Sequence, residues 1–109
     1  MSKYGNRKTE VDGILFDSKH EAHRWIELKY MERAGLIRDL QRQVPFELIP
    51  VIRNQAGKVV ERASKYVADF TYYEKDKLVV EDAKGIKTDV YKLKKKILLW
   101  RYGLEIREV

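Results

Sequence analysis

The sequence contains no cysteine. This absence excludes disulfide bonds, thiolate zinc sites and thiol nucleophiles, so a bound metal would have to be held by oxygen or imidazole ligands. The sequence also lacks any apolar run of about 18 residues, the length of a membrane span. No signal-type hydrophobic stretch stands near its start. We therefore expect no membrane association and a cytoplasmic location.

A chain of 109 residues is long enough for one hydrophobic core, which predicts a single domain over residues 1–109. Its 23 Lys and Arg outnumber its 17 Asp and Glu, giving a net charge of +6. This balance favours polyanionic partners such as nucleic acids, although many globular domains are equally basic. The polar, basic start of the chain predicts a flexible arm over residues 1–8.

The first third of the chain predicts a hairpin followed by a helix. Asp12-Gly13 is a type I′ turn signal between two short strands within residues 9–16. Ser18 and Glu21 match a capping box, which predicts a helix from Ser18 to about residue 34, with Gly35 just after its end. The expected buried stripe of this helix consists of Ala22, Trp25, Ile26, Leu28 and Met31.

The rest of the chain predicts strands over residues 44–52, 58–62, 65–73 and 78–84, a helix from Thr88 to about residue 102, and a last strand over 104–109. Pro45 in the first of these strands predicts a sheet edge or a bulge. A strand, a crossover helix and a strand make a parallel pair, so we expect an α/β (α+β) fold with a mixed sheet, in the order α-β-β-β-β-α-β after the N-terminal hairpin. The expected buried seam of the second helix is Val90, Leu93, Ile97 and Trp100.

Charged residues inside two expected strands are the main functional signal. Asp69 lies within one strand, and Asp82-Ala83-Lys84 ends the next. A hairpin around residues 74–77 would place Asp69 beside Asp82 and Lys84, which share one face of their strand, while Glu81 would point to the opposite face as a surface residue or a support for the site. Two carboxylates can bind a divalent metal and a lysine can orient water, a combination suited to phosphodiester hydrolysis. The alternative is structural: Asp69 would be a strand-edge acid bonded to a turn, and Asp82 and Lys84 would form a solvated cross-strand pair.

This pattern resembles the D…(D/E)-x-K signature of the PD-(D/E)XK nuclease superfamily, which includes restriction endonucleases and Holliday junction resolvases. Ala68 stands where the superfamily's name has proline. The resemblance extends over nearly the whole chain to small phage-encoded nuclease-like proteins, through segments at residues 3–6, 16–22, 68–70 and 81–85. It implies a restriction-endonuclease-like core.

The resemblance also implies a set of catalytic residues: Glu21, Asp69, Asp82 and Lys84. Asp69, Asp82 and the Ala83 carbonyl would hold Mg²⁺, for which Mn²⁺ can substitute, and Lys84 would position the attacking water. In the superfamily an N-terminal helix often supplies a third acid, which would be Glu21. The capping box is the competing explanation for Glu21.

Clustered basic residues predict where DNA binds. The second helix follows the Asp-x-Lys strand directly, so its basic flank should border the site, unless it is simply a solvated face. His20 and His23 are spaced for zinc on a helix, but a third nitrogen or sulfur ligand is missing, so we expect both at the surface. The predicted DNA-binding residues are Lys3, Arg7, Lys8, Lys87, Lys92, Lys95 and Lys96.

The sequence thus predicts a Mg²⁺-dependent DNA endonuclease that cuts branched or structured DNA, as Holliday junction resolvases do. Two nicks on opposed strands require two sites, so we expect a homodimer. The resemblance to phage-encoded proteins implies a bacterial host cell and a gene that a phage can carry. The alternatives are a basic nucleic-acid-binding module without catalysis and a restriction-type or transposition-type nuclease subunit.

Overall fold

The computed structural model describes residues 8–83 and 87–109. The chain begins with a hairpin of β1 (Thr9–Val11) and β2 (Ile14–Phe16), in which Asp12 and Gly13 both have positive φ, as a type I′ turn requires. Helix α1 (Lys19–Arg33) follows, and the Ser18 side chain caps it by accepting from the Glu21 N–H. Gly35, with φ 76°, lies just beyond its end. These predictions are confirmed.

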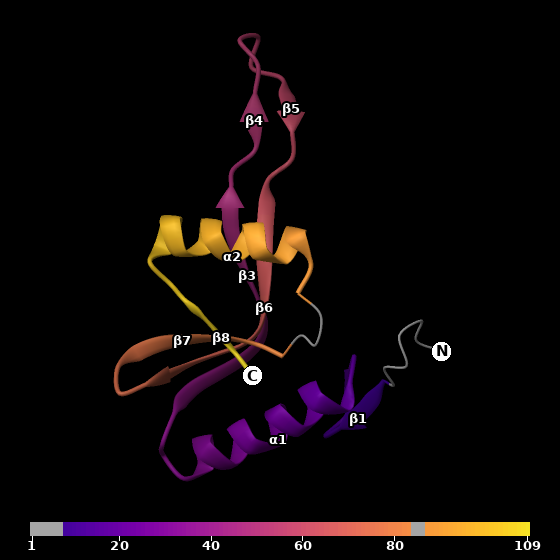
Figure 1. The fold of residues 1–109 in the computed structure, drawn as a ribbon, viewed down its shortest axis with the longest axis vertical. Coiled ribbons are helices and arrows are strands. Elements are labelled where there is room, and N and C mark those ends of the chain that lie inside the picture. The colour runs from indigo at the N-terminus through magenta and orange to yellow at the C-terminus, as the bar shows by residue number, and fades with distance from the viewer. Residues whose placement is uncertain (1–7, 84–86) are drawn as a thin grey trace.

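The central sheet has four strands in the order β3 (Arg38–Ile49), β6 (Ser64–Glu74), β7 (Lys77–Asp82) and β8 (Ile106–Glu108). The first three run antiparallel to their neighbours, and β8 lies parallel to β7 after the crossover through α2 (Asp89–Tyr102). The fold is therefore the expected mixed α+β arrangement (Figure 1). Pro45 lies in the edge strand β3, as predicted.

The strand expected over residues 44–52 has different bounds. Strand β3 begins at Arg38 and ends at Ile49, and the separate strand β4 (Ile52–Arg53) follows Pro50. Proline has no N–H to donate, so the ladder is interrupted there. The described chain therefore has five strands between the two helices where four were expected.

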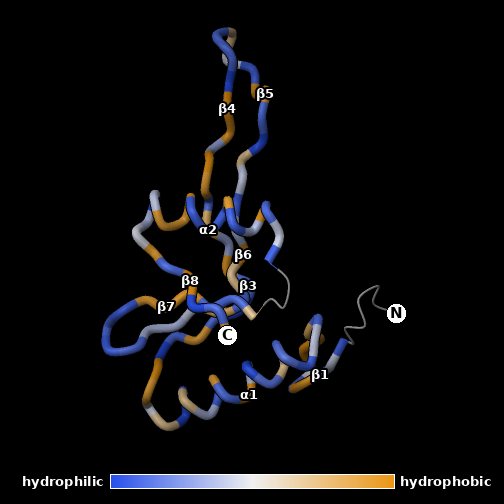
Figure 2. Tube along the Cα trace, in the orientation of Figure 1, coloured by the Kyte–Doolittle hydropathy of each residue, from blue (hydrophilic) through white to orange (hydrophobic). Residues whose placement is uncertain are grey.

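Two apolar clusters hold the helices to the sheet. Trp25 and Leu28 of α1 pack with Phe70 and Tyr72 of the sheet. A second cluster joins Leu98 of α2 to other sheet residues. Figure 2 shows these hydrophobic segments alternating with polar ones along both helices and the sheet. None of the described helices is both long enough and apolar enough to cross a membrane.

Helix α2 packs through a different stripe from the one predicted. Val90, Leu93 and Trp100 are 64%, 57% and 82% exposed, whereas Tyr91 and Leu98 are buried against the sheet. Of the predicted seam, only Ile97 is partly buried in the cluster. Apolar residues occupy two stripes of this helix, and the spacing alone does not tell which stripe meets the sheet. In α1 the same error concerns Ile26, which is 38% exposed.

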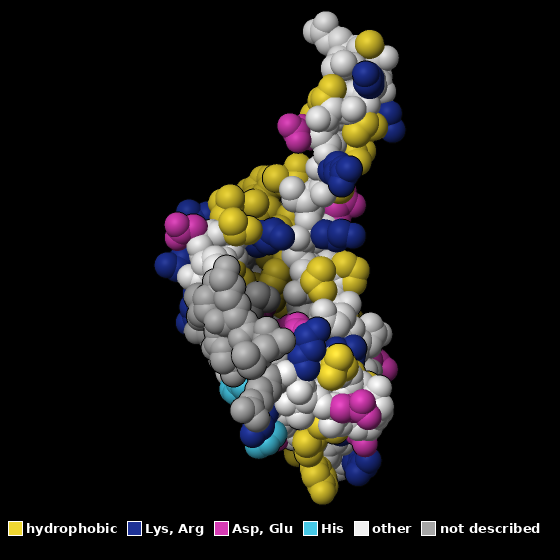
Figure 3. All heavy atoms as spheres, turned by 90° about the vertical axis from the view of Figure 1, so that its right-hand side faces the viewer, with side chains coloured by type: hydrophobic (Ala, Val, Ile, Leu, Met, Phe, Trp, Pro, Cys, Tyr) yellow, Lys and Arg dark blue, Asp and Glu magenta, His cyan; other side chains and the backbone are white. Residues whose placement is uncertain are grey.

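A two-stranded ribbon projects from the body. It consists of β4 and β5 (Val59–Glu61), which continue beyond the sheet between β3 and β6. We call residues 50–65 the arm. It defines one end of the longest molecular axis, 52 Å (Figure 1), and carries Lys and Arg at several points (Figure 3).

Candidate active site at the end of the β6–β7 ladder

Asp69 and Asp82 meet where strands β6 and β7 stop pairing. The last paired residues are Phe70 and Glu81. Just beyond them, the Ala83 N–H donates to Asp69 Oδ2 at 2.8 Å. The predicted approach of the two acidic segments is therefore confirmed.

Asp82 lies inside the protein and is 1% exposed. The Tyr66 hydroxyl donates to its Oδ2 at 2.6 Å. Burial first, and then this hydrogen bond to Asp82, raise the pKa of Tyr66, so Tyr66 keeps its proton and remains a donor. A buried carboxylate needs such a partner, and Tyr66 fixes the side chain's direction.

Glu21 comes to the same place from the first turn of α1. Its side chain is 5% exposed. Desolvation, followed by the negative charges of Asp69 and Asp17, raises its pKa from 4.5 to about 7. The backbone N–H of Glu21 thus completes the helix cap, and its carboxyl group is coupled electrostatically to Asp69, while its role as a metal ligand stays a prediction.

Arg42 is a residue of this site that the sequence did not indicate. It lies on β3 opposite Phe70, and its guanidinium carbon lies 4.9 Å from the ring centre of Phe16. Its charge lowers the pKa of Glu21, partly offsetting the desolvation. Among the described residues its buried Nε has no hydrogen-bond partner. Arg42 therefore places a positive charge beside the acids, with one donor unused.

Of the two positions expected for Glu81, a surface residue or a support for the site, the structure shows the second. Glu81 is 0% exposed, and Arg24 of α1 binds both its oxygens, Nε at 2.8 Å and Nη2 at 2.6 Å. Tyr72 also donates to it. The opposite face of β7 is covered by α1, so this residue docks the helix that carries Glu21.

Glu108 links the site to the basic residues that follow β7. Glu108 is the register partner of Asp82 across the parallel strands. Tyr91 donates to its Oε2 at 2.7 Å, and Lys87 and Lys95 lie 3.2 and 3.4 Å from its Oε1. The Tyr91 hydrogen bond, followed by the lysines, lowers the pKa of Glu108. Lys87 and Lys95 therefore border the site, as predicted, but partly neutralise an acid there.

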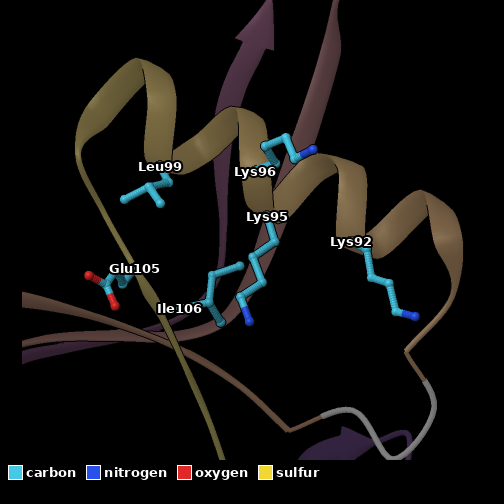
Figure 4. Close-up of a pocket in the computed structure, with 6 residues that line it drawn as sticks. All are labelled: Lys92, Lys95, Lys96, Leu99, Glu105 and Ile106. Carbon is cyan, nitrogen blue, oxygen red and sulfur yellow. The ribbon is translucent and has the colours of Figure 1, made fainter.

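A pocket of about 320 Å³ beside α2 is lined by Lys92, Lys95, Lys96, Leu99, Glu105 and Ile106. In Figure 4, Lys92 and Lys95 extend from the helix on one side, whereas Lys96 points in a different direction. The three predicted DNA-binding lysines of α2 thus lie around one concavity without converging on a single point.

Several predicted residues fall elsewhere. Lys84, Lys3 and Arg7 lie outside the described residues, and Lys8 is exposed at the start of the described chain. His20 and His23 are both exposed, as predicted. The His20 Nε2 lies 2.8 Å from the carbonyl oxygen of Val109, so it connects α1 to the end of β8.

The family model for proteins of unknown function designated DUF1064 matches residues 1–108. The chain belongs to the DUF1064 family. No curated protein and no solved structure matches it.

The donor set partly fits a divalent cation. Carboxylate oxygens are the ligands that Mg²⁺ prefers. The pKa of Glu21 is raised first by desolvation and then by the charge of Asp69, and a cation would stabilise the ionised form that both effects disfavour. Within residues 8–83 and 87–109, however, no three acidic or histidine side chains stand close enough together to hold a metal. Asp82 is instead oriented by Tyr66. The described residues thus fit a divalent cation in two respects: their donors are carboxylate oxygens, and Glu21 and Asp69 lie close enough to interact.

Proposed function

We propose that this DUF1064 protein is a metal-dependent DNA endonuclease that hydrolyses phosphodiester bonds, a member of the PD-(D/E)XK superfamily with a restriction-endonuclease-like core. The observation that carries the proposal is the approach of Glu21 and Asp69 at the end of the β6–β7 ladder, close to a third, buried acid. Desolvation first, and then the charge of Asp69, raise the pKa of Glu21, and the buried Asp82 directly precedes Ala83, whose N–H donates to Asp69. A protein maintains such a costly arrangement most readily for chemistry.

Glu21, Asp69, Asp82 and the Ala83 carbonyl would hold Mg²⁺ or Mn²⁺. The ion would polarise the scissile phosphate and lower the pKa of bound water. Tyr66 orients Asp82, and the Arg24–Glu81 pair holds α1, and with it Glu21, against the sheet. Arg42 supplies positive charge beside the acids. In the superfamily pattern Lys84 positions the water.

The proposed substrate is branched or structured DNA in the cytoplasm of a bacterial host, with the gene carried by a phage. Its phosphates would contact the basic flank formed by Lys87, Lys92 and Lys95. Opposed nicks need two active sites, so we propose a homodimer. The exposed residues Leu93 and Trp100 of α2 are an apolar surface that a dimer would bury.

The second candidate is a nucleic-acid-binding protein without catalysis. One observation favours it: the acids of the described segments are not gathered into a metal-sized group. This candidate predicts DNA binding that neither needs metal nor leads to cleavage.

A cleavage panel separates the two candidates. Four-way junction, flap, duplex and single-stranded DNA are incubated with the protein and Mg²⁺, Mn²⁺ or EDTA. We expect metal-dependent products, most from the branched substrates. Binding to DNA with no cleavage under any metal condition would establish the second candidate instead.

A further inference from the structure

The arm is a ribbon with a preformed tip. The side-chain oxygen of Asn54 accepts from the N–H groups of Ala56 and Lys58 at 3.0 and 3.1 Å, and Arg53 Nη1 donates to the Gly57 carbonyl at 2.8 Å. Gly57 takes a φ of +82°, which glycine adopts without strain. The arm's own hydrogen bonds thus shape its tip in the absence of packing from the body.

The arm is exposed along its whole length. Every residue from 50 to 65 is exposed, including Val51 at 47%, Ile52 at 47%, Val59 at 42% and Val60 at 51%. Figure 2 shows these hydrophobic positions interspersed with hydrophilic ones. An ordered ribbon that leaves its apolar side chains about half exposed is suited to contact with a partner.

The charges of the arm indicate which partner. Four basic residues, Arg53, Lys58, Arg62 and Lys65, stand against one acid, Glu61. In the described part of the chain, Lys58, Arg62 and Lys65 take part in no salt bridge. A second copy would bring the same positive charge against this surface, whereas a nucleic acid offers complementary phosphates.

We propose that the arm is a DNA-binding β-ribbon that enters the major groove of duplex DNA. The major groove, about 12 Å wide, admits a two-stranded ribbon. Residues 50–65 contain no aromatic side chain on which bases of a single strand could stack, so the arm favours double helices. This inference rests on the proposed function, because the arm would hold a double-helical part of the nuclease's substrate away from the cleavage site.

The spacing of arm and site follows from strand β6. Glu61 in the arm stands eight positions before Asp69, and an extended chain rises about 3.3 Å per residue, so the two are at most about 26 Å apart. Along a double helix with about 3.4 Å per base pair this equals at most about 8 base pairs. The arm should therefore contact DNA within about 8 base pairs of the bond that is cut.

The test is DNA binding without cleavage. The Asp69→Asn protein, in EDTA, is titrated with a labelled duplex of about 30 base pairs, some three helical turns, and with a single strand of equal length. In the arm variant, Lys58, Arg62 and Lys65 are replaced by Gln, while Arg53 is kept because it supports the tip. The matched control replaces the exposed residues Arg33, Lys75 and Lys77 by Gln, which removes the same charge elsewhere.

We expect the arm variant to bind the duplex about tenfold more weakly at low salt, with the slope of log affinity against log salt reduced by up to about 3, since each lost phosphate contact removes about 0.9. The control should change either quantity little, and single-strand binding should be nearly unaffected by the arm substitutions.

Equal losses in arm variant and control, or none in either, would overturn the proposal. So would a dimer by light scattering that becomes a monomer on Val59→Ser and Val60→Ser substitution, because the arm would then bind a second copy. These readouts need no cleavage, so they stand apart from the nuclease proposal. Cleavage without arm-dependent binding rejects only the arm, and arm-dependent binding without cleavage by the wild-type protein rejects only the nuclease.

Discussion

Glu21 shows how one residue serves folding and the site together. Its N–H is bonded by the cap residue Ser18, while its carboxyl group lies in a desolvated position near the charges of Asp69, Asp17 and Arg42. Desolvation, the largest of these effects, and the two aspartates raise its pKa, and Arg42 opposes them. A carboxyl with a pKa of about 7 is half ionised at neutral pH, so its charge responds to any cation that approaches.

This raised pKa predicts how stability depends on pH. The folded protein keeps the Glu21 proton up to about pH 7, whereas the unfolded chain loses it near the ordinary value of 4.5, so stability falls as the pH rises between these values. Relative to Glu21→Gln, the wild-type free energy of unfolding should drop by about 3 kcal/mol from pH 5 to pH 8. Urea unfolding of both proteins at the two pH values measures this.

Mg²⁺ should restore part of the loss at pH 8 in the wild-type protein and less in Glu21→Gln, because the ion binds the ionised carboxyl group. If the difference in stability between the two proteins were the same at pH 5 and pH 8, the Glu21 carboxyl group would not be desolvated.

At the residue level the sequence was informative where chemistry is local. The cap at Ser18, the turn at Asp12-Gly13 and the approach of Asp69 to residue 83 depend on near neighbours or on one hairpin. Arg42 and the Arg24–Glu81 pair join residues far apart in the sequence, and nothing in their local pattern indicates the partner. Alternation in β7 predicted correctly that Glu81 faces away from Asp82, but not that α1 covers that face.

Among the elements, α1 is fixed to the sheet by an ionic contact as well as by its apolar stripe. Arg24 is mostly buried, and its partner Glu81 is fully buried. Removing one member of such a pair leaves a buried charge without its partner. The position of α1, and hence of Glu21, should depend on this contact.

Arg24→Met should therefore destabilise the protein by about 3–5 kcal/mol, whereas the double variant Arg24→Met, Glu81→Gln should lose clearly less, because no buried charge remains. Lys87→Met serves as the control, since it removes an exposed ion pair with Glu108 and should cost at most about 1 kcal/mol. Urea unfolding at pH 7 gives all three values. An Arg24→Met protein as stable as the control would show that α1 is held by apolar packing alone.

Helix α2 illustrates why element-level packing was only partly predictable. Val90, Leu93, Ile97 and Trp100 have the spacing of a buried seam, yet Tyr91 and Leu98 face the sheet. Periodicity identifies the helix and its two apolar stripes. Which stripe packs on the sheet depends on how the chain crosses from β7 through α2 to β8. The exposed stripe of α2 is available for contact with a partner molecule.

Replacing Leu93 and Trp100 together by Ser should cost less than about 1 kcal/mol of stability, because neither side chain is buried in the monomer. If α2 forms the proposed dimer interface, the same variant should sediment as a monomer where the wild-type protein sediments as a dimer. The buried residue Leu98 provides the contrast, since Leu98→Ser should destabilise the fold by several kcal/mol, about as much as other large-to-small core changes. A dimer unchanged by the double substitution would place the interface elsewhere.

For the molecule as a whole, the alternation of elements was enough to predict a mixed sheet with a parallel β7–α2–β8 unit. The arm was not predicted, because the pattern of the strands expected over residues 44–52 and 58–62 does not say whether they pack on the body. The resulting molecule has acids at the end of the β6–β7 ladder, lysines around α2, and a basic ribbon at the far end of the same strand β6. The DUF1064 family model matches residues 1–108, which include the acids, the lysines and the ribbon.

The measurement that tests the central claim most directly is the rate of DNA cleavage by wild-type and Asp69→Asn proteins, with Mg²⁺ and with EDTA. Asparagine keeps the shape of the side chain and can still accept from the Ala83 N–H, so folding and DNA affinity in EDTA should stay close to wild type. We predict Mg²⁺-dependent cleavage by the wild-type protein and a loss of at least about a hundredfold in Asp69→Asn. Wild-type protein that binds DNA but never cleaves it, or Asp69→Asn that cleaves at the wild-type rate, would contradict the account.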